Sequence, residues 1–220
     1  MPGAVILENL GYLMRGLATT GQLALVSFGL ACLGGIGLAL LRASRWGPAS
    51  YPAVVYIESV RGIPLVMVIF WVYFFLPVLT RQAPNAYLSS LIALTAYTAA
   101  YLAEIFRAGI LSVPRGQVDA ALASGLRFLQ AMVHVVLPQA LRNMLPAIIN
   151  QFVSLFKGTS LVFIIGVVDF FRAAVLVDSR EFKSFPIYAF VGVVYLVICT
   201  LLSALAQRLR SRVAMVAIEI

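Results

Sequence analysis

Four long stretches without a charged side chain limit the folds open to this sequence more than any other feature. They span residues 16–41, 62–80, 82–103 and 184–207. Each is about as long as the helix of roughly 20 residues that crosses a bilayer, or longer. Only 11% of the 220 residues are charged, against about 25% in a soluble domain. The sequence therefore predicts an all-α integral membrane protein, with residues 1–220 as one transmembrane domain.

Five spans are expected, at about 17–41, 53–79, 87–111, 141–177 and 185–205. The second span contains Pro64, which removes a backbone donor and favours a kink. The fourth region is too long for a single span, and Lys157 and Gly158 interrupt it, so we predict a broken helix there. Residues 113–138 separate the third span from the fourth and are predicted to form a cytoplasmic loop.

The positions of the basic residues indicate how the chain is oriented. With five spans and the N-terminus outside, more basic residues fall inside than outside, which follows the positive-inside rule. The inside residues are Arg42, Arg45, Arg107, Arg115, Arg127, Arg142, Arg208, Arg210 and Arg212, and the outside residues are Arg15, Arg81, Arg172, Arg180 and Lys183. We therefore predict an external N-terminus and a cytoplasmic C-terminus. The net charge of +8 is a sign of this topology, so no nucleic-acid partner is expected.

The loop 113–138 holds the longest polar-rich interruption between the apolar runs. A helix of small residues comes first, a glycine follows, and an apolar run closes with a Leu-Pro pair. Small side chains let another helix approach the backbone closely, and glycine permits a turn that a Cβ would hinder. We predict a short helix at the membrane surface onto which another protein docks. The docking residues are expected to be Asp119, Ala120, Ala121, Gly125 and Leu126.

Acid–base pairs three residues apart occur in or beside three spans. They are Glu58–Arg61, Glu104–Arg107 and Asp169–Arg172. Residues at this spacing share a helix face and neutralise each other, so we predict three structural ion pairs. Charge within a membrane is costly and commonly functional. The pair of Glu58 and Arg61 therefore stays open to a second interpretation, in which it lines a translocation path.

The interruption of the fourth region is the best candidate for a substrate site. Transporters build sites near the bilayer midplane from broken helices. A cation with two hydroxyls and freed backbone N–H groups suits a substrate carboxylate, and a cationic path favours an acidic or zwitterionic substrate. The path candidates are Arg61, Lys157, Thr159 and Ser160. In the alternative interpretation, Lys157 pairs with Asp169 or with an acid of another subunit.

No set of residues in the sequence fits catalysis. There is no Gly-rich phosphate loop, no Cys/His metal spacing and no Ser/His/acid set, and His134 is the only histidine. We predict that the chain is not an enzyme and holds no metal and no cofactor. ATP chemistry, if the protein uses it, belongs to another chain.

Several motifs together resemble the polar amino-acid subfamily of ABC transporter permeases, the family of the histidine, glutamine and glutamate/aspartate permeases. The loop has the acid-Ala-Ala-x3-Gly-x9-aliphatic-x-Leu-Pro spacing of ABC importer permeases. The other motifs lie at 61–65, 103–110, 112–117 and 156–161. Residues 63–68, 160–162 and 169–172 look most like the glutamate/aspartate permeases. In the loop, Asp119 and Val135 stand where the family usually has Glu and Ile. Within the amino-acid branch, Ile63 stands where many members have Thr, and Gly158 where an acidic residue is common.

The resemblance implies a type I importer transmembrane domain with five core helices and a cytoplasmic coupling helix, in the bacterial cytoplasmic (inner) membrane. It implies an ATP-driven importer of acidic amino acids, with a second permease chain, identical or a sister. Two ATPase subunits inside would bind ATP and Mg and receive the docking residues, and a periplasmic or lipid-anchored binding protein would deliver substrate outside. The alternatives are the same machine for glutamine, histidine or arginine, and an ion-coupled secondary transporter, which would not need the docking loop.

Overall fold

The computed structural model describes residues 2–44 and 47–216, and the side chains of residues 5–44 and 47–208. Within these residues every regular element is a helix. The side chains of Arg45, Arg210 and Arg212 lie outside the described residues. The elements are α1 (Pro2–Glu8), α2 (Leu10–Ala43), α3 (Gly47–Gly62), α4 (Leu65–Thr80), α5 (Ala86–Leu111), α6 (Arg115–Ala123), α7 (Phe128–Ala131), the π-helical segment η1 (Met132–Val136), α8 (Leu137–Gly158), the 3₁₀ segment η2 (Thr159–Ile165), α9 (Phe170–Glu181) and α10 (Ser184–Val216).

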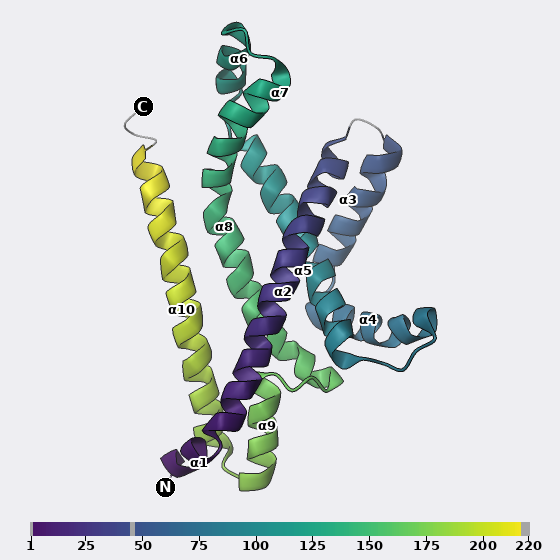
Figure 1. Cartoon of the computed structure of the whole chain (residues 1–220), viewed down its shortest axis with the longest axis vertical. Coiled ribbons are helices and arrows are strands. Elements are labelled where there is room, and N and C mark those ends of the chain that lie inside the picture. The colour runs from purple at the N-terminus through teal and green to yellow at the C-terminus, as the bar shows by residue number, and fades with distance from the viewer. Residues whose placement is uncertain (1, 45–46, 217–220) are drawn as a thin grey trace.

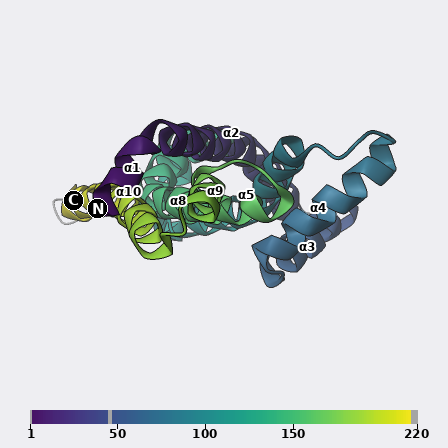
Figure 2. The same cartoon turned by 90° about the horizontal axis from the view of Figure 1, so that it is seen from below.

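The long helices α2, α5, α8 and α10 run roughly along the long axis of the molecule (Figure 1). The short helices α6 and α7 lie at one end, which we call the α6 end, and α1 and α9 lie at the other, the α9 end. The C-terminal parts of α2 and α10 also lie toward the α6 end. Seen from below, α3 and α4 stand to one side of the other helices (Figure 2).

Four helical stretches are long and apolar enough to cross a membrane, and a bent pair makes a fifth. The four are Leu10–Ala43, Ala86–Leu111, Phe128–Ile165 and Ser184–Arg208. The pair is α3 with α4, and the helix axis bends by 114° at the break between them. The second span expected at 53–79 is thus sharply bent, at the Pro64 where a kink was expected. Pro64 explains the break, because it disfavours helical backbone in the residue before it and has an extended conformation itself, with ψ of 138°.

The fourth region also differs from the predicted 141–177. The membrane-length helix begins earlier, at Phe128, and runs through Lys157 to Ile165. The chain turns only at Gly166, whose φ is +93°, and α9 is a separate short helix. The backbone N–H of Thr159 donates to the Leu155 carbonyl, so the predicted freeing of N–H groups does not occur at Thr159.

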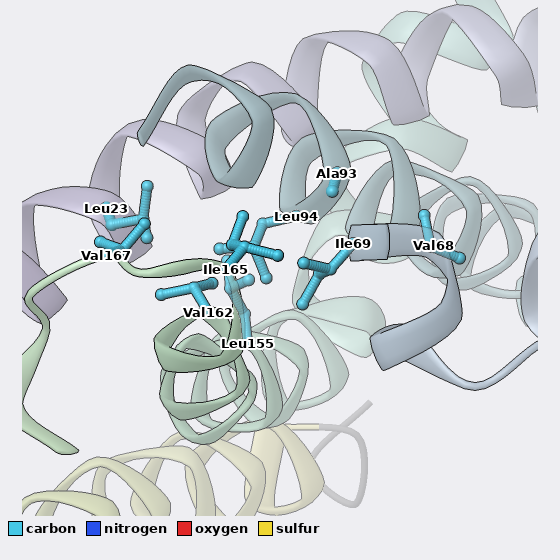
Figure 3. Packing of buried hydrophobic residues seen from close by; sticks show 9 residues of the cluster. All are labelled: Leu23, Val68, Ile69, Ala93, Leu94, Leu155, Val162, Ile165 and Val167. Atoms are coloured by element: carbon cyan, nitrogen blue, oxygen red, sulfur yellow. The ribbon is translucent and has the colours of Figure 1, made fainter. Parts of the chain in front are cut away.

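One buried cluster shows how the break between α3 and α4 is held. Its side chains come from α2, α4, α5, α8 and η2 and from the loop before α9 (Figure 3). They are Leu23, Val68, Ile69, Ala93, Leu94, Leu155, Val162, Ile165 and Val167. Close van der Waals packing is a main force between helices in a bilayer. The cluster thus fixes α4 against η2, and with it the corner that α3 and α4 make.

Two glycines allow helices to approach closely. A Cβ at Gly16 on α2 would lie 2.8 Å from the backbone oxygen of Asp169 and 2.8 Å from the Cβ of Ala173 on α9. A Cβ at Gly109 on α5 would lie 2.8 Å from the Cβ of Met144 on α8. These glycines set the spacing of α2 from α9 and of α5 from α8.

Candidate functional site

The predicted docking segment, within residues 113–138, consists of the helix α6, a tight turn and the short helix α7, at the α6 end (Figure 1). α5 ends at Leu111, and Pro114 precedes α6. After α6 the chain turns at Gly125, which has φ of +85°, and the N–H of Leu126 donates to the Ala121 carbonyl at 3.2 Å. Nothing lies within 4 Å of a Cβ added at Gly125. Glycine is therefore needed for its backbone conformation and not for close contact within this chain.

The predicted docking residues differ in their exposure. Asp119, Ala120 and Gly125 are exposed, and Leu126 is half-buried. Ala121 is buried in its own chain, at 7% exposure, so its side chain is less accessible to a partner than those of Asp119 and Ala120.

Three large apolar side chains at this end went unpredicted. Leu122, Phe128 and Leu129 are 41%, 65% and 73% exposed. For Leu122 the signal in the sequence was its helical spacing, because it follows Asp119 by three residues and shares its face of α6. The exposed surface of the segment is thus both apolar and polar, which suits a protein partner.

Apolar contacts tie the docking segment to the span helices. Val118 of α6 packs against a cluster of side chains from α5, the loop after it, η1 and α8. The cluster consists of Val113, Val136, Ala140 and Met144, with Ile105, Phe106, Ile110, Met132 and Ile148 around them. A displacement of α6 therefore reaches the ends of α5 and α8 through η1 and this cluster.

An ion-pair network joins α5 to two other helices, α2 and α3, and Arg42 of α2 is its centre. Nη1 of Arg42 lies 3.0 Å from Glu58 Oε1 on α3 and 3.2 Å from Glu104 Oε2 on α5. Glu104 also pairs with Arg107, whose Nε lies 3.0 Å from both carboxylate oxygens. Arg61 is farther from Glu58, at 4.0 Å. The network joins α2, α3 and α5, and the spacing rule had found only its pairs within single helices.

Asp169 does not form the predicted ion pair with Arg172. It is fully buried, and its carboxylate accepts the backbone N–H groups of Phe171 and Arg172 at 3.2 and 2.8 Å. The helix begins only at Phe170, so Asp169 caps it and does not share a helix face with Arg172. The alternative pairing of Lys157 with Asp169 is also absent from the ion pairs of the described residues.

Lys157 opens onto a groove of about 280 Å³ between the end of α8, α9 and α10. The groove is lined by Lys157, Ser160, Phe171, Tyr188, Val191, Gly192 and Tyr195. Lys157 is exposed there, and the Ser160 hydroxyl donates to the Lys157 carbonyl at 2.8 Å. Thr159 is fully buried and donates to the Phe156 carbonyl at 2.7 Å. Of the four path candidates, the structure therefore brings only Lys157 and Ser160 to this groove.

Arg61 lies elsewhere, at the corner between α3 and α4. Its guanidinium carbon lies 5.5 Å from the centroid of the Tyr101 ring, a cation–π contact. The Tyr101 hydroxyl donates to the Arg61 carbonyl at 3.4 Å. The corner touches α8 through Leu65, whose Cδ2 lies 2.8 Å from a Cβ built at Gly158. Arg61 thus belongs to the ionic corner and does not line the Lys157 groove.

Comparison with known families decides the class of protein. A family profile described as "Binding-protein-dependent transport system inner membrane component" matches residues 31–215. The chain belongs to this family. The permease is thus an integral membrane component and not an enzyme, and ATP hydrolysis in such transporters belongs to a separate subunit.

Individual relatives agree with the family over nearly the whole permease. The glutamate/aspartate import permease protein GltK of Escherichia coli O6:H1 is 38% identical over 216 residues, which cover 95% of this chain and 96% of that protein. The probable glutamine ABC transporter permease protein GlnM of Bacillus subtilis is 34% identical over 209 residues, covering 95% and 96%.

Solved structures share the fold. A crystal structure of an amino acid ABC transporter with histidines has a TM-score of 0.89 at 31% identity, covering 94% of this permease and 96% of that chain. A structure of the MetNI methionine ABC transporter has a TM-score of 0.76 at 18% identity, covering 93% and 97%. The permease therefore has the type I ABC importer fold that the motifs predicted.

Proposed function

We propose that this permease is the membrane-spanning subunit of an ATP-driven importer for acidic amino acids, glutamate or aspartate. Its likeness to the glutamate/aspartate import permease over almost the full length carries the proposal. The groove at Lys157 supports it, because an exposed ammonium beside a hydroxyl favours a carboxylate over a second cation.

The exposed docking segment supports a role for partner subunits. In the proposed complex two ATPase subunits bind ATP and Mg and receive Asp119, Ala120, Gly125 and Leu126. A second permease chain, identical or a sister, completes the membrane part. A periplasmic or lipid-anchored binding protein delivers substrate at the α9 end, which we assign to the outside together with the N-terminus.

Force transmission follows from the contacts of α6. Closure of the ATPases on ATP would pull the docking segment, and the apolar cluster around Val118 would pass the pull to α5 and α8. The ends of these helices would then move together, and the path would switch from inward-facing to outward-facing. Release of ADP and phosphate would reset it.

A second substrate class is favoured by specific observations. The glutamine permease GlnM is nearly as similar as the glutamate/aspartate permease. Gly158 also lacks the acidic side chain common in the family, which alters the charge beside Lys157. The same machine with glutamine or another polar amino acid as substrate is therefore the alternative.

The deciding experiment measures ATPase activity of the complex reconstituted in liposomes, purified through this chain with its co-purifying subunits and the cognate binding protein. We expect glutamate or aspartate to stimulate hydrolysis, and glutamine, histidine and arginine to leave it near the basal rate. The complex with Leu201→Ala, at an exposed apolar position of α10, is the control for handling and should respond to the amino acids as the unmodified complex does.

The outcomes separate the parts of the proposal. Stimulation by another amino acid alone would retain the ATP-driven importer and refute the acidic substrate. Purification of the chain without any ATPase subunit would refute the docking role of α6.

A further inference from the structure

α8 carries a stripe of exposed residues, four of them polar and one a small alanine, that is unusual for a membrane-length helix. Its members are Asn143, Ala147, Asn150, Ser154 and Lys157, and all five are exposed. They follow one another by four and three residues, which places them on one face. Polar side chains within a span rarely face lipid and instead mark a water-filled cavity or a path.

α10 packs against α8, and the two helices leave one space at each end of their seam. The groove at Lys157 lies toward the α9 end. A larger cleft of about 580 Å³ lies toward the α6 end and is lined by Asn143, Pro146, Ala147, Asn150, Ser203, Ala206 and Gln207. Its volume falls within the range of roughly 300–1,000 Å³ typical of small-molecule sites. Along α8 only Ser154 of the stripe lies between the two spaces.

The cleft offers complementary groups for both ends of an amino acid. The amides of Asn150 and Gln207 and the hydroxyl of Ser203 can donate to a carboxylate. Asn143 also lines the cleft, and its amide nitrogen donates to the Ser112 hydroxyl. Its amide oxygen can accept a hydrogen bond from an ammonium group. The lining contains no charged side chain, so a zwitterion can bind there without being trapped by a strong ion pair.

We propose that the seam between α8 and α10 is the route of the substrate, and that the cleft at the α6 end is a second, neutral subsite for the amino acid before its release. Lys157 attracts the substrate carboxylate at the first groove, and Ser154 and Asn150 follow it along the same face. The proposal rests on the proposed import function, but it does not depend on which amino acid is carried.

The test measures aqueous access along the stripe. Cys32 and Cys199, both free thiols, are first replaced by alanine in the complete complex. Single variants Asn143→Cys, Asn150→Cys and Ser154→Cys are then labelled with a membrane-impermeant maleimide from the α6 side. The matched controls are Leu145→Cys on α8 and Leu201→Cys on α10, which are 37% and 67% exposed but apolar.

We expect the stripe variants to react at least about tenfold faster than the controls, because the reactive thiolate forms in water. Millimolar L-glutamate or L-glutamine on the same side should slow labelling at Asn150→Cys. Asn150→Leu should lower the maximal uptake rate about tenfold through a lost hydrogen bond to a charged group, and Asn150→Gln should restore most of it.

Three results would overturn the inference. Labelling of the stripe at the slow rate of the controls would mean that lipid covers it. A disulfide-linked permease dimer through Asn150→Cys would assign the stripe to a subunit interface. Fast labelling without protection by either amino acid, together with normal uptake by Asn150→Leu, would reduce the cleft to a solvated crevice. None of these results bears on ATPase stimulation, so the import function would stand or fall separately.

Discussion

Arg42 should stabilise the packing of α2 against α3 and α5, and the exposure of its ion pairs sets the size of its contribution to the free energy of unfolding. Its side chain is 19% exposed and bridges Glu58, which is 55% exposed, and Glu104, which is 21% exposed. Exposed ion pairs contribute about 0–1 kcal/mol, whereas removing one partner of a buried pair costs about 3–5 kcal/mol. The Arg42 pairs lie between these limits.

The charge balance predicts an order among the variants. Three guanidinium groups face two carboxylates, so Arg42→Met leaves Glu104 paired with Arg107 and Glu58 near Arg61. We expect a loss of about 1–2 kcal/mol in the free energy of unfolding. Glu104→Gln removes the carboxylate that two arginines share, and we expect about 2–3 kcal/mol. The cost should therefore be larger for the acid than for the base.

Thermal unfolding of the purified permease in detergent measures these losses, since about 1 kcal/mol corresponds to roughly 2–4 °C for a chain of this size. The double variant Arg42→Met/Glu104→Gln should lose at least about 0.5 kcal/mol less than the sum of the single losses. Arg142→Met, at an exposed position on α8, is the control and should change little. Additive losses, or a larger cost for Arg42→Met than for Glu104→Gln, would refute the network as described.

Three further perturbations test other parts of the structure. Gly16→Ala should be less stable than Gly21→Ala by about 1–3 kcal/mol, because the new Cβ meets the Asp169 backbone, whereas nothing lies within 4 Å at Gly21; equal melting temperatures would contradict the contact of α2 with α9. Gly125→Asn should keep ATPase-coupled uptake, since Asn tolerates a positive φ. Gly125→Trp should insert into the membrane normally but lose ATPase-coupled uptake, and normal uptake by this variant would argue against docking at Gly125. Lys157→Met should weaken uptake of glutamate while Lys157→Arg keeps most of it, and unchanged kinetics in both would leave Lys157 a structural role.

The sequence was sufficient for the features that depend on local patterns. Apolar runs located the helices that end near Ala43 and Leu111, and Pro114 and Gly125 marked the limits of α6. The partners of Arg42 could not be found this way, because Glu58 and Glu104 follow it by 16 and 62 residues. They meet only after the helices pack.

The errors have similarly physical origins. The spacing of Asp169 and Arg172 suggested an ion pair only if both residues lay within a helix, and the helix starts one residue too late. The fourth region was expected at 141–177, broken at Lys157 and Gly158. The α-helix α8 does end at Gly158, but the chain goes on as the 3₁₀ segment η2 and turns only at Gly166, whose φ is positive.

The π-helical segment η1 has a consequence for how such permeases diverge. Its five residues, Met132–Val136, join α7 to α8, and the N–H after it bonds five residues back, from Leu137 to Met132. Each residue gained or lost in a continuous helix turns what lies beyond by about 100°. Loss of one residue here would restore α-helical winding and swing the surface of α6 around the axis of α8, with no change in its composition. If α6 docks the ATPase as proposed above, chain length at this point would decide which ATPase surface fits, because the two registers present different faces of α6.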